Sequence, residues 1–261
     1  MPTLASILAE TRTRVATLEG RADELAERAT TAPIPRPFVE RRGQAVGVVA
    51  EVKRRSPSQG AIRPELDPVK LAQAYERGGA VGVSVLTEEK HFGGSLDDLH
   101  RVAGSLSIPV LRKDFIINEV QVLEARVAGA SAVLLIARIV LPNQLDQLAR
   151  LVRYWKMTPL IEVHDVGELD DAFKTDPEVL GVNARDLDTL QMNPGRAEEI
   201  MRRVPSYITL VAESGVERRK DVERLAAAGA DLILVGTSVA RQDDPENAVR
   251  SLTGVQRQAR P

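Results

Sequence analysis

The 261-residue chain contains no cysteine, only three histidines and only eight aromatic residues (four Phe, three Tyr and one Trp). Without cysteine it cannot hold a disulfide, a thiolate zinc site, an iron–sulfur cluster or a cysteine nucleophile. Its charges nearly cancel, with 35 basic against 37 acidic residues and a formal net charge of −2. A nearly neutral chain with few aromatics is not expected to bind nucleic acid by phosphate neutralisation or base stacking.

The sequence also lacks a long apolar run. Its longest runs, such as 132–137, are the size of a strand and far from the roughly 18 residues that a membrane span needs. The N-terminal segment is amphipathic, carries Glu10 early and has no apolar signal core. We therefore expect a cytoplasmic protein that does not enter a membrane.

The first 30 residues carry leucine, isoleucine and valine at three- and four-residue spacing among charged residues, which predicts helix with a break near Gly20. The proline-rich segment 32–37 follows, and it predicts a stiff extended linker. We assign residues 1–45 to an N-terminal helical extension with its linker, and residues 46–261 to one main domain.

From residue 46 onward, short β-branched apolar runs alternate with amphipathic helix patterns. The strands are predicted at 46–52, 81–86, 109–112, 132–136, 159–163, 179–182, 209–212 and 232–235. The helices are predicted at 68–77, 96–103, 119–128, 142–154, 166–173, 196–203, 217–228 and 245–252. The strand runs are continuously apolar, as in parallel strands that are buried on both faces.

Eight βα units in one series predict an α/β fold, the (β/α)8 TIM barrel. The alternative is an open doubly wound sheet, which usually carries G-x-G-x-x-G after its first strand. Segment 51–60 reads EVKRRSPSQG and lacks that fingerprint. In the barrel, the N-terminal extension could cover either the mouth or the bottom.

The active site of a TIM barrel lies at the C-terminal ends of its strands. Five predicted strand ends carry chemically capable side chains directly after an apolar run. They are Glu51 with Lys53, Lys113, Glu162, Asn183 with Arg185, and Glu213. Alternation along the first strand places Glu51 and Lys53 on the same side.

Two lysines among three carboxylates predict proton-transfer chemistry without a metal. His91, His100 and His164 have no evident partners in the sequence and are expected to be structural. A lysine in such a cleft is either a general acid or, with a lowered pKa, a Schiff-base former, and the sequence leaves both open.

Small residues follow the last two predicted strands. Ser214-Gly215 and Gly236-Thr237 form turns in which glycine allows close approach of a ligand and a helix N-terminus favours an anion. TIM barrels frequently bind phosphate at this position. Ser56 after the first strand could reach the same ligand, whereas Ser58 is expected to form a simple turn. The residues thus predict an enzyme that acts on a phosphorylated small molecule.

Six segments in chain order resemble the motifs of the indole-3-glycerol phosphate synthase family. They are EVKRRSPSQG at 51–60, SVLTE at 84–88, FGGSL at 92–96, RKDFI at 112–116, GVNARDL at 181–187 and AESGV at 212–216. The resemblance implies a carboxy-lyase of tryptophan biosynthesis. Its substrate would be 1-(2-carboxyphenylamino)-1-deoxyribulose 5-phosphate, its products indole-3-glycerol phosphate, carbon dioxide and water, with no metal or organic cofactor.

The resemblance also implies catalytic roles. Lys113 would be the general acid that protonates the ketone oxygen during ring closure. Glu162, Lys53 and Glu51 are the candidates for the acid and the base of the later loss of water, and the division among them stays open.

Binding roles follow from the same resemblance. Asn183 and Glu213 would position the substrate, and Arg185 would add charge. The phosphate-binding residues would be Ser56, Ser214, Gly215, Gly236 and Thr237, with Arg55 as a helper. Phe92 and Phe115 flank the site motifs and are predicted to line the pocket for the aryl ring, with a plain core role as the alternative.

The chain departs from the family pattern at Arg55, where lysine is frequent, and at Ala184 and Thr237-Ser238, which leaves the fine substrate contacts open. A phosphoribosylanthranilate isomerase type of barrel is disfavoured because it would use a cysteine. A non-catalytic binding barrel is disfavoured by the intact set of capable side chains. We expect a monomer or weak homo-oligomer whose partner is the phosphorylated small molecule.

Overall fold

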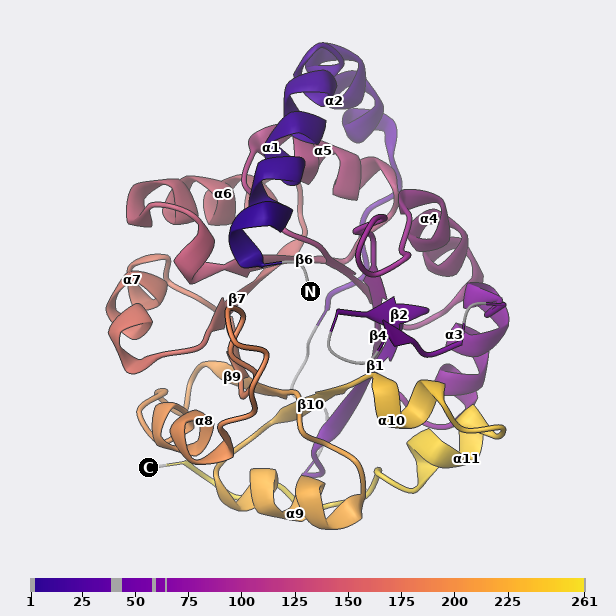
Figure 1. Cartoon of the computed structure of the whole chain (residues 1–261), viewed down its shortest axis with the longest axis vertical. Coiled ribbons are helices and arrows are strands. Elements are labelled where there is room, and N and C mark those ends of the chain that lie inside the picture. Colours follow the sequence, from indigo (N-terminus) through magenta and orange to yellow (C-terminus); the bar gives the residue numbers. More distant parts are fainter. Residues whose placement is uncertain (1–2, 39–43, 58–59, 64, 261) are drawn as a thin grey trace.

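Eight parallel strands close into a barrel, seen end-on in Figure 1. The computed structural model describes residues 3–38, 44–57, 60–63 and 65–260. The strands are β1 Gly47–Val52, β4 Gly82–Leu86, β5 Val110–Lys113, β6 Ala132–Ile136, β7 Thr158–Val163, β8 Val179–Asn183, β9 Thr209–Glu213 and β10 Leu232–Val235. The first strand pairs with the last, Gly47 opposite Leu232, so the doubly wound alternative is wrong and the predicted TIM barrel is confirmed.

Helices surround the barrel and cover the outer face of the strands (Figure 1). They are α3 Pro68–Arg77, α4 Leu96–Ser105, α5 Glu119–Val127, α6 Pro142–Tyr154, α7 Leu169–Lys174, α8 Pro194–Met201, α9 Arg219–Ala227 and α11 Pro245–Arg250. The 3₁₀ turns η1 Ala137–Ile139 and η2 Val166–Glu168 follow β6 and β7. The α8 helix begins two residues before the predicted start, because Asn193 caps it and Pro194 occupies its first turn.

Three short elements near the barrel mouth were not predicted. Strands β2 Arg55–Ser56 and β3 Gly60–Ala61 form an antiparallel pair after β1. The four-residue helix α10 Thr237–Ala240 follows β10 directly, with Gly236 at its N-cap. Ser58, predicted to lie in a simple turn, falls outside the described residues.

The N-terminal extension forms helices α1 Leu4–Glu19 and α2 Ala22–Thr31, which separate at Gly20 as predicted. Val15 and Leu25 pack with Val120 of α5 in a small apolar cluster. Helix α1 extends from α5 toward the middle of one end of the barrel (Figure 1). The predicted linker, residues 32–37, has no regular secondary structure, and residues 39–43 lie outside the described part of the chain.

Alternation along the strands separates two apolar layers. Val48, Ala50 and Val52 of β1 face the surrounding helices. The inward positions fill an inner core, which includes Val49 of β1 and its counterparts Leu111, Leu160 and Val211 on β5, β7 and β9. The next inward residue on each of these strands is polar, namely Glu51, Lys113, Glu162 and Glu213. A charged layer therefore lies directly above the apolar one.

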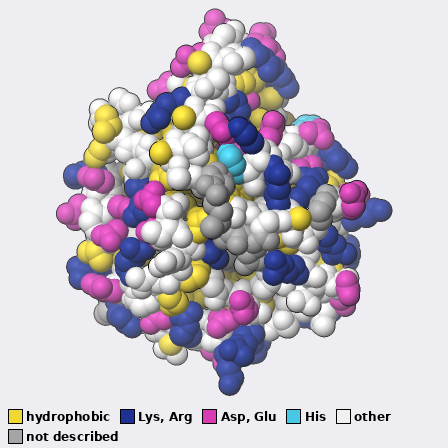
Figure 2. Space-filling model, in the orientation of Figure 1, with side chains coloured by type: hydrophobic (Ala, Val, Ile, Leu, Met, Phe, Trp, Pro, Cys, Tyr) yellow, Lys and Arg dark blue, Asp and Glu magenta, His cyan; other side chains and the backbone are white. Residues whose placement is uncertain are grey.

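The outer surface carries charges of both signs. Figure 2 shows acidic and basic side chains interspersed over the face that is viewed along the barrel, with hydrophobic side chains near its middle. Among the described helices, none has both the length and the apolar character needed to cross a membrane.

Candidate active site

A cavity of about 550 Å³ opens at the C-terminal ends of the barrel strands. Of the residues predicted for the site, all except Arg55 line it: Glu51, Lys53, Ser56, Phe92, Lys113, Phe115, Glu162, Asn183, Arg185, Glu213, Ser214, Gly215, Gly236 and Thr237. Helix α1 contributes Leu4 and Ile7 to the same wall, so this helix of the N-terminal extension covers the mouth, whereas Phe38 of the following segment packs into the inner core near Gly82 at the start of β4. Placement in one cavity leaves the individual roles as predictions.

Lys113 lies at the centre of the charged layer. Its Nζ donates to Glu162 Oε2 at 3.0 Å and to Glu213 Oε2 at 2.8 Å. Both carboxylates are buried, with 1% of each side chain exposed. Three strands of the barrel, β5, β7 and β9, thus bring one ammonium group and two carboxylates together.

The carboxylates determine the charge state of Lys113. Burial by itself would lower the pKa of this lysine, but Glu162, Glu213 and Glu51 raise the pKa above its usual value. Lys113 is therefore an ammonium ion at neutral pH.

The two carboxylates that share Lys113 have different pKa values. Burial and the neighbouring charge of Glu162 raise the pKa of Glu213 to about 8. Burial also acts on Glu162, but Lys113 and His164 outweigh it and hold the pKa of Glu162 well below its usual range. Glu162 is therefore the ionised member of the pair, and Glu213 is the one that takes up a proton more readily.

His164 is not the isolated structural residue that the sequence suggested. Its Nε2 lies 3.1 Å from Glu162 Oε1, and both side chains are buried. The sequence separation of two residues along a strand end could have indicated this contact, because positions 162 and 164 share one side.

Lys53 and Glu51 form a second ion pair at the mouth, with Nζ 2.6 Å from Glu51 Oε1. This agrees with the predicted alternation in β1. The carboxylate lies against Gly236, where a β-carbon would stand 2.5 Å from Glu51 Oε1. Glycine at the end of β10 therefore gives room to a carboxylate from β1.

Asn183 connects the sixth and seventh strand ends of the barrel. Its Oδ1 accepts a hydrogen bond from Ser214 Oγ at 2.9 Å and one from the backbone N–H of Arg185 at 3.0 Å. Ser214 and Gly215 both have positive φ, 68° and 78°. The Arg185 guanidinium donates to the carbonyl of Leu190 at 2.9 Å, which holds it at the cavity wall.

The apolar part of the wall contains the two predicted aromatics. The rings of Phe92 and Phe115 lie 6.2 Å apart at 44°, a tilted arrangement. Both pack against the inner core, as the alternative core role requires, and both also line the cavity.

The prediction for basic residues near the phosphate turns was wrong at Arg55 and did not include Arg241. Arg55 donates to the carbonyl of Glu89 at 3.3 Å and is not among the residues that line the cavity. Arg241, which follows α10, does line it beside the turns of β9 and β10. Its position one helix beyond Gly236-Thr237 was the signal available in the sequence.

A buried network behind Lys113 ties α1 to the barrel. Arg112 is fully buried and donates to Thr87 Oγ1 at 3.1 Å and to Asp114 Oδ2 at 3.1 Å. Asp114 Oδ2 also accepts from Arg14 of α1 at 2.9 Å. The residues on both sides of Lys113 along the chain are therefore fixed, and so is the helix over the mouth.

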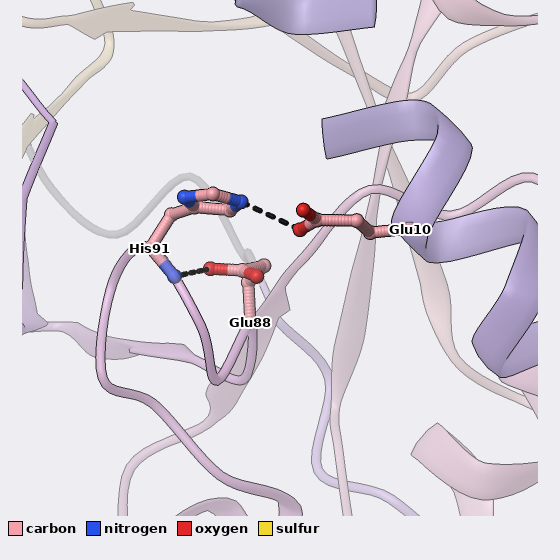
Figure 3. A group of neighbouring side chains, drawn as sticks. All are labelled: Glu10, Glu88 and His91. Carbon is pink, nitrogen blue, oxygen red and sulfur yellow. Dashed lines mark hydrogen bonds and ion pairs between the residues drawn. The ribbon is translucent and has the colours of Figure 1, made fainter. Parts of the chain in front are cut away.

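One group of possible metal ligands exists among the described residues, namely Glu10, Glu88 and His91 (Figure 3). His91 Nε2 lies 2.7 Å from Glu10 Oε2, which corrects the expectation that His91 has no partner. Glu10 Oε1 accepts from Lys90 Nζ at 2.6 Å, and Glu88 accepts three backbone N–H groups, from residues 90, 91 and 92. A cation here would displace an ammonium group, so the cluster is built as a tether between α1 and the loop after β4.

A profile of the indole-3-glycerol phosphate synthase family matches residues 4–252. The chain belongs to the indole-3-glycerol phosphate synthase family. Relatives include the indole-3-glycerol phosphate synthase of Mycolicibacterium smegmatis, 46% identical over 252 residues, which are 95% of this chain and 93% of the relative. Indole-3-glycerol phosphate synthase 1 of Streptomyces coelicolor is 46% identical over 246 residues, 94% of this chain and 90% of the relative.

The similarity to solved structures concerns the fold alone. The 3-hexulose-6-phosphate synthase of Salmonella typhimurium superposes with a TM-score of 0.64 at 13% identity, over 79% of this chain and 96% of that chain. Membership in the indole-3-glycerol phosphate synthase family confirms the resemblance carried by the six motifs. It also confirms the prediction of a carboxy-lyase of tryptophan biosynthesis over that of an isomerase type of barrel.

Proposed function

We propose that this protein converts 1-(2-carboxyphenylamino)-1-deoxyribulose 5-phosphate into indole-3-glycerol phosphate, carbon dioxide and water. Family membership supports the reaction. The observation that carries the residue roles is the Lys113 ammonium held between two buried carboxylates in the cavity. A volume of about 550 Å³ suits a ligand of this size.

Lys113 is the general acid of ring closure. Its raised pKa keeps the ammonium proton available for the ketone oxygen while the aromatic carbon attacks. Loss of carbon dioxide then restores the aromatic ring. A Schiff base would need a lowered pKa, so the acid role is the one that the electrostatics support.

Glu162 and Lys53 carry the dehydration step. The ionised Glu162 takes a proton from the ring-closed intermediate, and Lys53 gives one to the departing hydroxyl, which leaves as water. Glu51, 2.6 Å from Lys53 Nζ, orients that ammonium group. Glu213 and Asn183, on the neighbouring strands β9 and β8, hold the substrate.

The remaining lining residues bind the two ends of the substrate. The phosphate is assigned to Ser56 and to the turns Ser214-Gly215 and Gly236-Thr237, with Arg241 as a further cation. The aryl ring is assigned to Phe92 and Phe115 under Leu4 and Ile7 of α1, with Arg185 near its carboxylate.

Several expectations stay predictions: a reaction without metal or organic cofactor, a cytoplasmic location, a monomer or weak homo-oligomer, and a division into residues 1–45 and 46–261.

Incubation of the purified protein with the substrate tests the function, because the product is detected by its indole fluorescence. We expect product with the wild type and almost none with Lys113→Ala. Absence of product at high wild-type concentration contradicts the proposal, and turnover of phosphoribosylanthranilate instead would support the isomerase alternative.

A further inference from the structure

Two carboxylates share one ammonium group in this site, but their surroundings are unequal. Glu162 and Glu213 accept from Lys113 at 3.0 Å and 2.8 Å, so this lysine alone does not distinguish them. Glu162 Oε1 lies within ion-pair distance of the His164 imidazole, at 3.1 Å from Nε2 and without hydrogen-bond geometry, whereas Glu213 Oε1 has neither an ion pair nor a hydrogen bond among the described residues. An additional cationic side chain therefore lies beside Glu162 only.

His164 is held between two carboxylates. It is fully buried directly after β7, with Nε2 3.1 Å from Glu162 Oε1 and Nδ1 3.8 Å from Glu168 Oε2. Glu168 lies in η2 and accepts the backbone N–H of His164 at 2.7 Å, while Arg138 donates to its other oxygen at 2.7 Å. The charged groups that face the imidazole are thus Glu162 from β7 and Glu168 from η2, with Lys113 and Arg138 one step beyond them.

We infer that His164 is a positioning residue whose imidazolium makes Glu162, and not Glu213, the ionised carboxylate of the pair. The inference rests on the proposed function, in which Glu162 is the base. A cation at 3.1 Å in a buried site favours the charged form of the carboxylate beside it. Since the two carboxylates repel each other, the proton that Glu162 gives up stays on Glu213.

The His164 imidazole can supply this positive charge throughout the neutral pH range. Burial would lower the pKa of His164, but Glu162 and Glu168 together raise it to about 9. The imidazole is therefore cationic at neutral pH and supplies a fixed charge that never touches the substrate. Arg138 neutralises the far side of Glu168, so Glu168 serves as a counter-ion and a rigid support.

The pH profile of kcat in the variant His164→Asn tests the inference. Without the imidazolium the pKa of Glu162 rises, so we expect the acid limb of kcat to move up by about one pH unit or more. At a pH on the acid limb, turnover would fall about tenfold for a shift of one unit, with little loss at pH 8 and little change in KM. The exposed His100→Asn is the matched control and should keep the wild-type profile. An unchanged profile in His164→Asn overturns the inference, because a space-filling histidine would not move it.

A second measurement does not depend on turnover or on the folding of that variant. The chain has three histidines, so their imidazole signals can be resolved by NMR and assigned with His91→Asn and His100→Asn. We expect one imidazole to remain protonated to about pH 9 in the wild type and to titrate at lower pH in Glu168→Gln. A neutral His164 at pH 7 overturns the inference even if the enzyme is active. Absence of product with a cationic His164 would instead contradict the proposed function.

Discussion

Glu213 lies against Gly181 of the neighbouring strand. A β-carbon at position 181 would collide with Glu213 Oε1 and stand 3.4 Å from its Cδ. Residues 181 and 211 are paired in the β8–β9 register, so the carboxylate folds back over the strand beside its own. Glycine at 181 therefore provides the space in which Glu213 can reach Lys113.

Gly181→Ala should lower kcat by about a hundredfold, because a displacement near 1 Å of a positioned group can cost that much. The effect should appear in steady-state turnover, while the far-ultraviolet circular dichroism spectrum stays that of the wild type. Gly104→Ala on α4 meets no atom within 4 Å and is the matched control. Equal losses in both variants would contradict a specific role for the space at 181.

Lys113→Ala should lower kcat by about two to four orders of magnitude, the range typical of a general acid. KM should change modestly, because the proton is shared with the substrate chiefly in the transition state. The exposed Lys220→Ala is the control for a lost lysine charge. Unchanged kcat in Lys113→Ala would exclude the acid role.

Gly215→Val should weaken binding of the substrate and of inorganic phosphate. Its φ of 78° favours glycine, and a β-carbon there would stand 2.8 Å from Met192 Cε. Loss of charge-assisted hydrogen bonds predicts about a ten- to hundredfold higher KM and phosphate inhibition constant. If both constants match the wild type, the phosphate site lies elsewhere in the cavity.

Much of this arrangement follows from local patterns. Continuous apolar runs gave eight buried strands, and alternation placed Glu51 and Lys53 on one side. The contacts that the sequence did not reveal join distant segments. Arg14 and Asp114 meet although 100 residues separate them. The charged side chain of Arg112 can be buried in a strand because Thr87, Asp114 and Gln121 accept hydrogen bonds from it. The periodicity of the sequence does not indicate these partners.

Arg14→Met should loosen α1 from the barrel. The variant retains an apolar stem but loses the 2.9 Å ion pair to Asp114, which predicts a loss of about 1–3 kcal/mol in the free energy of unfolding. KM should also rise, since α1 carries Leu4 and Ile7 into the cavity wall. Urea denaturation and steady-state kinetics measure both effects. Arg12→Met on the exposed side of the same helix should change neither, and an equal response of the two variants would contradict the tether.

The free energy of unfolding should decrease between pH 7 and pH 9. Folding raises the pKa of Glu213 to about 8 and that of His164 to about 9, so the folded protein retains protons that the unfolded chain has released. This stabilisation is complete below the unfolded pKa values and is lost as the pH rises through the folded ones. Each such proton contributes a slope of about 1.4 kcal/mol per pH unit.

Urea denaturation at constant ionic strength measures this slope. Glu213→Gln removes one of the two groups and should show a shallower decrease than the wild type. A free energy of unfolding that stays constant from pH 7 to pH 9 would contradict the raised pKa values.

The pairing of β1 with β10 also has a consequence during synthesis on the ribosome. Strand β1, which carries Glu51, emerges before the other barrel strands, whereas its partner strand β10 and Gly236 emerge after all of them. Until then the nascent sheet has two open edges, β1 and β9, which can pair with other chains. Insertion of β10 removes both edges and places Gly236 beside Glu51 in a single event. Protection from aggregation and completion of the catalytic mouth are therefore the same step of assembly.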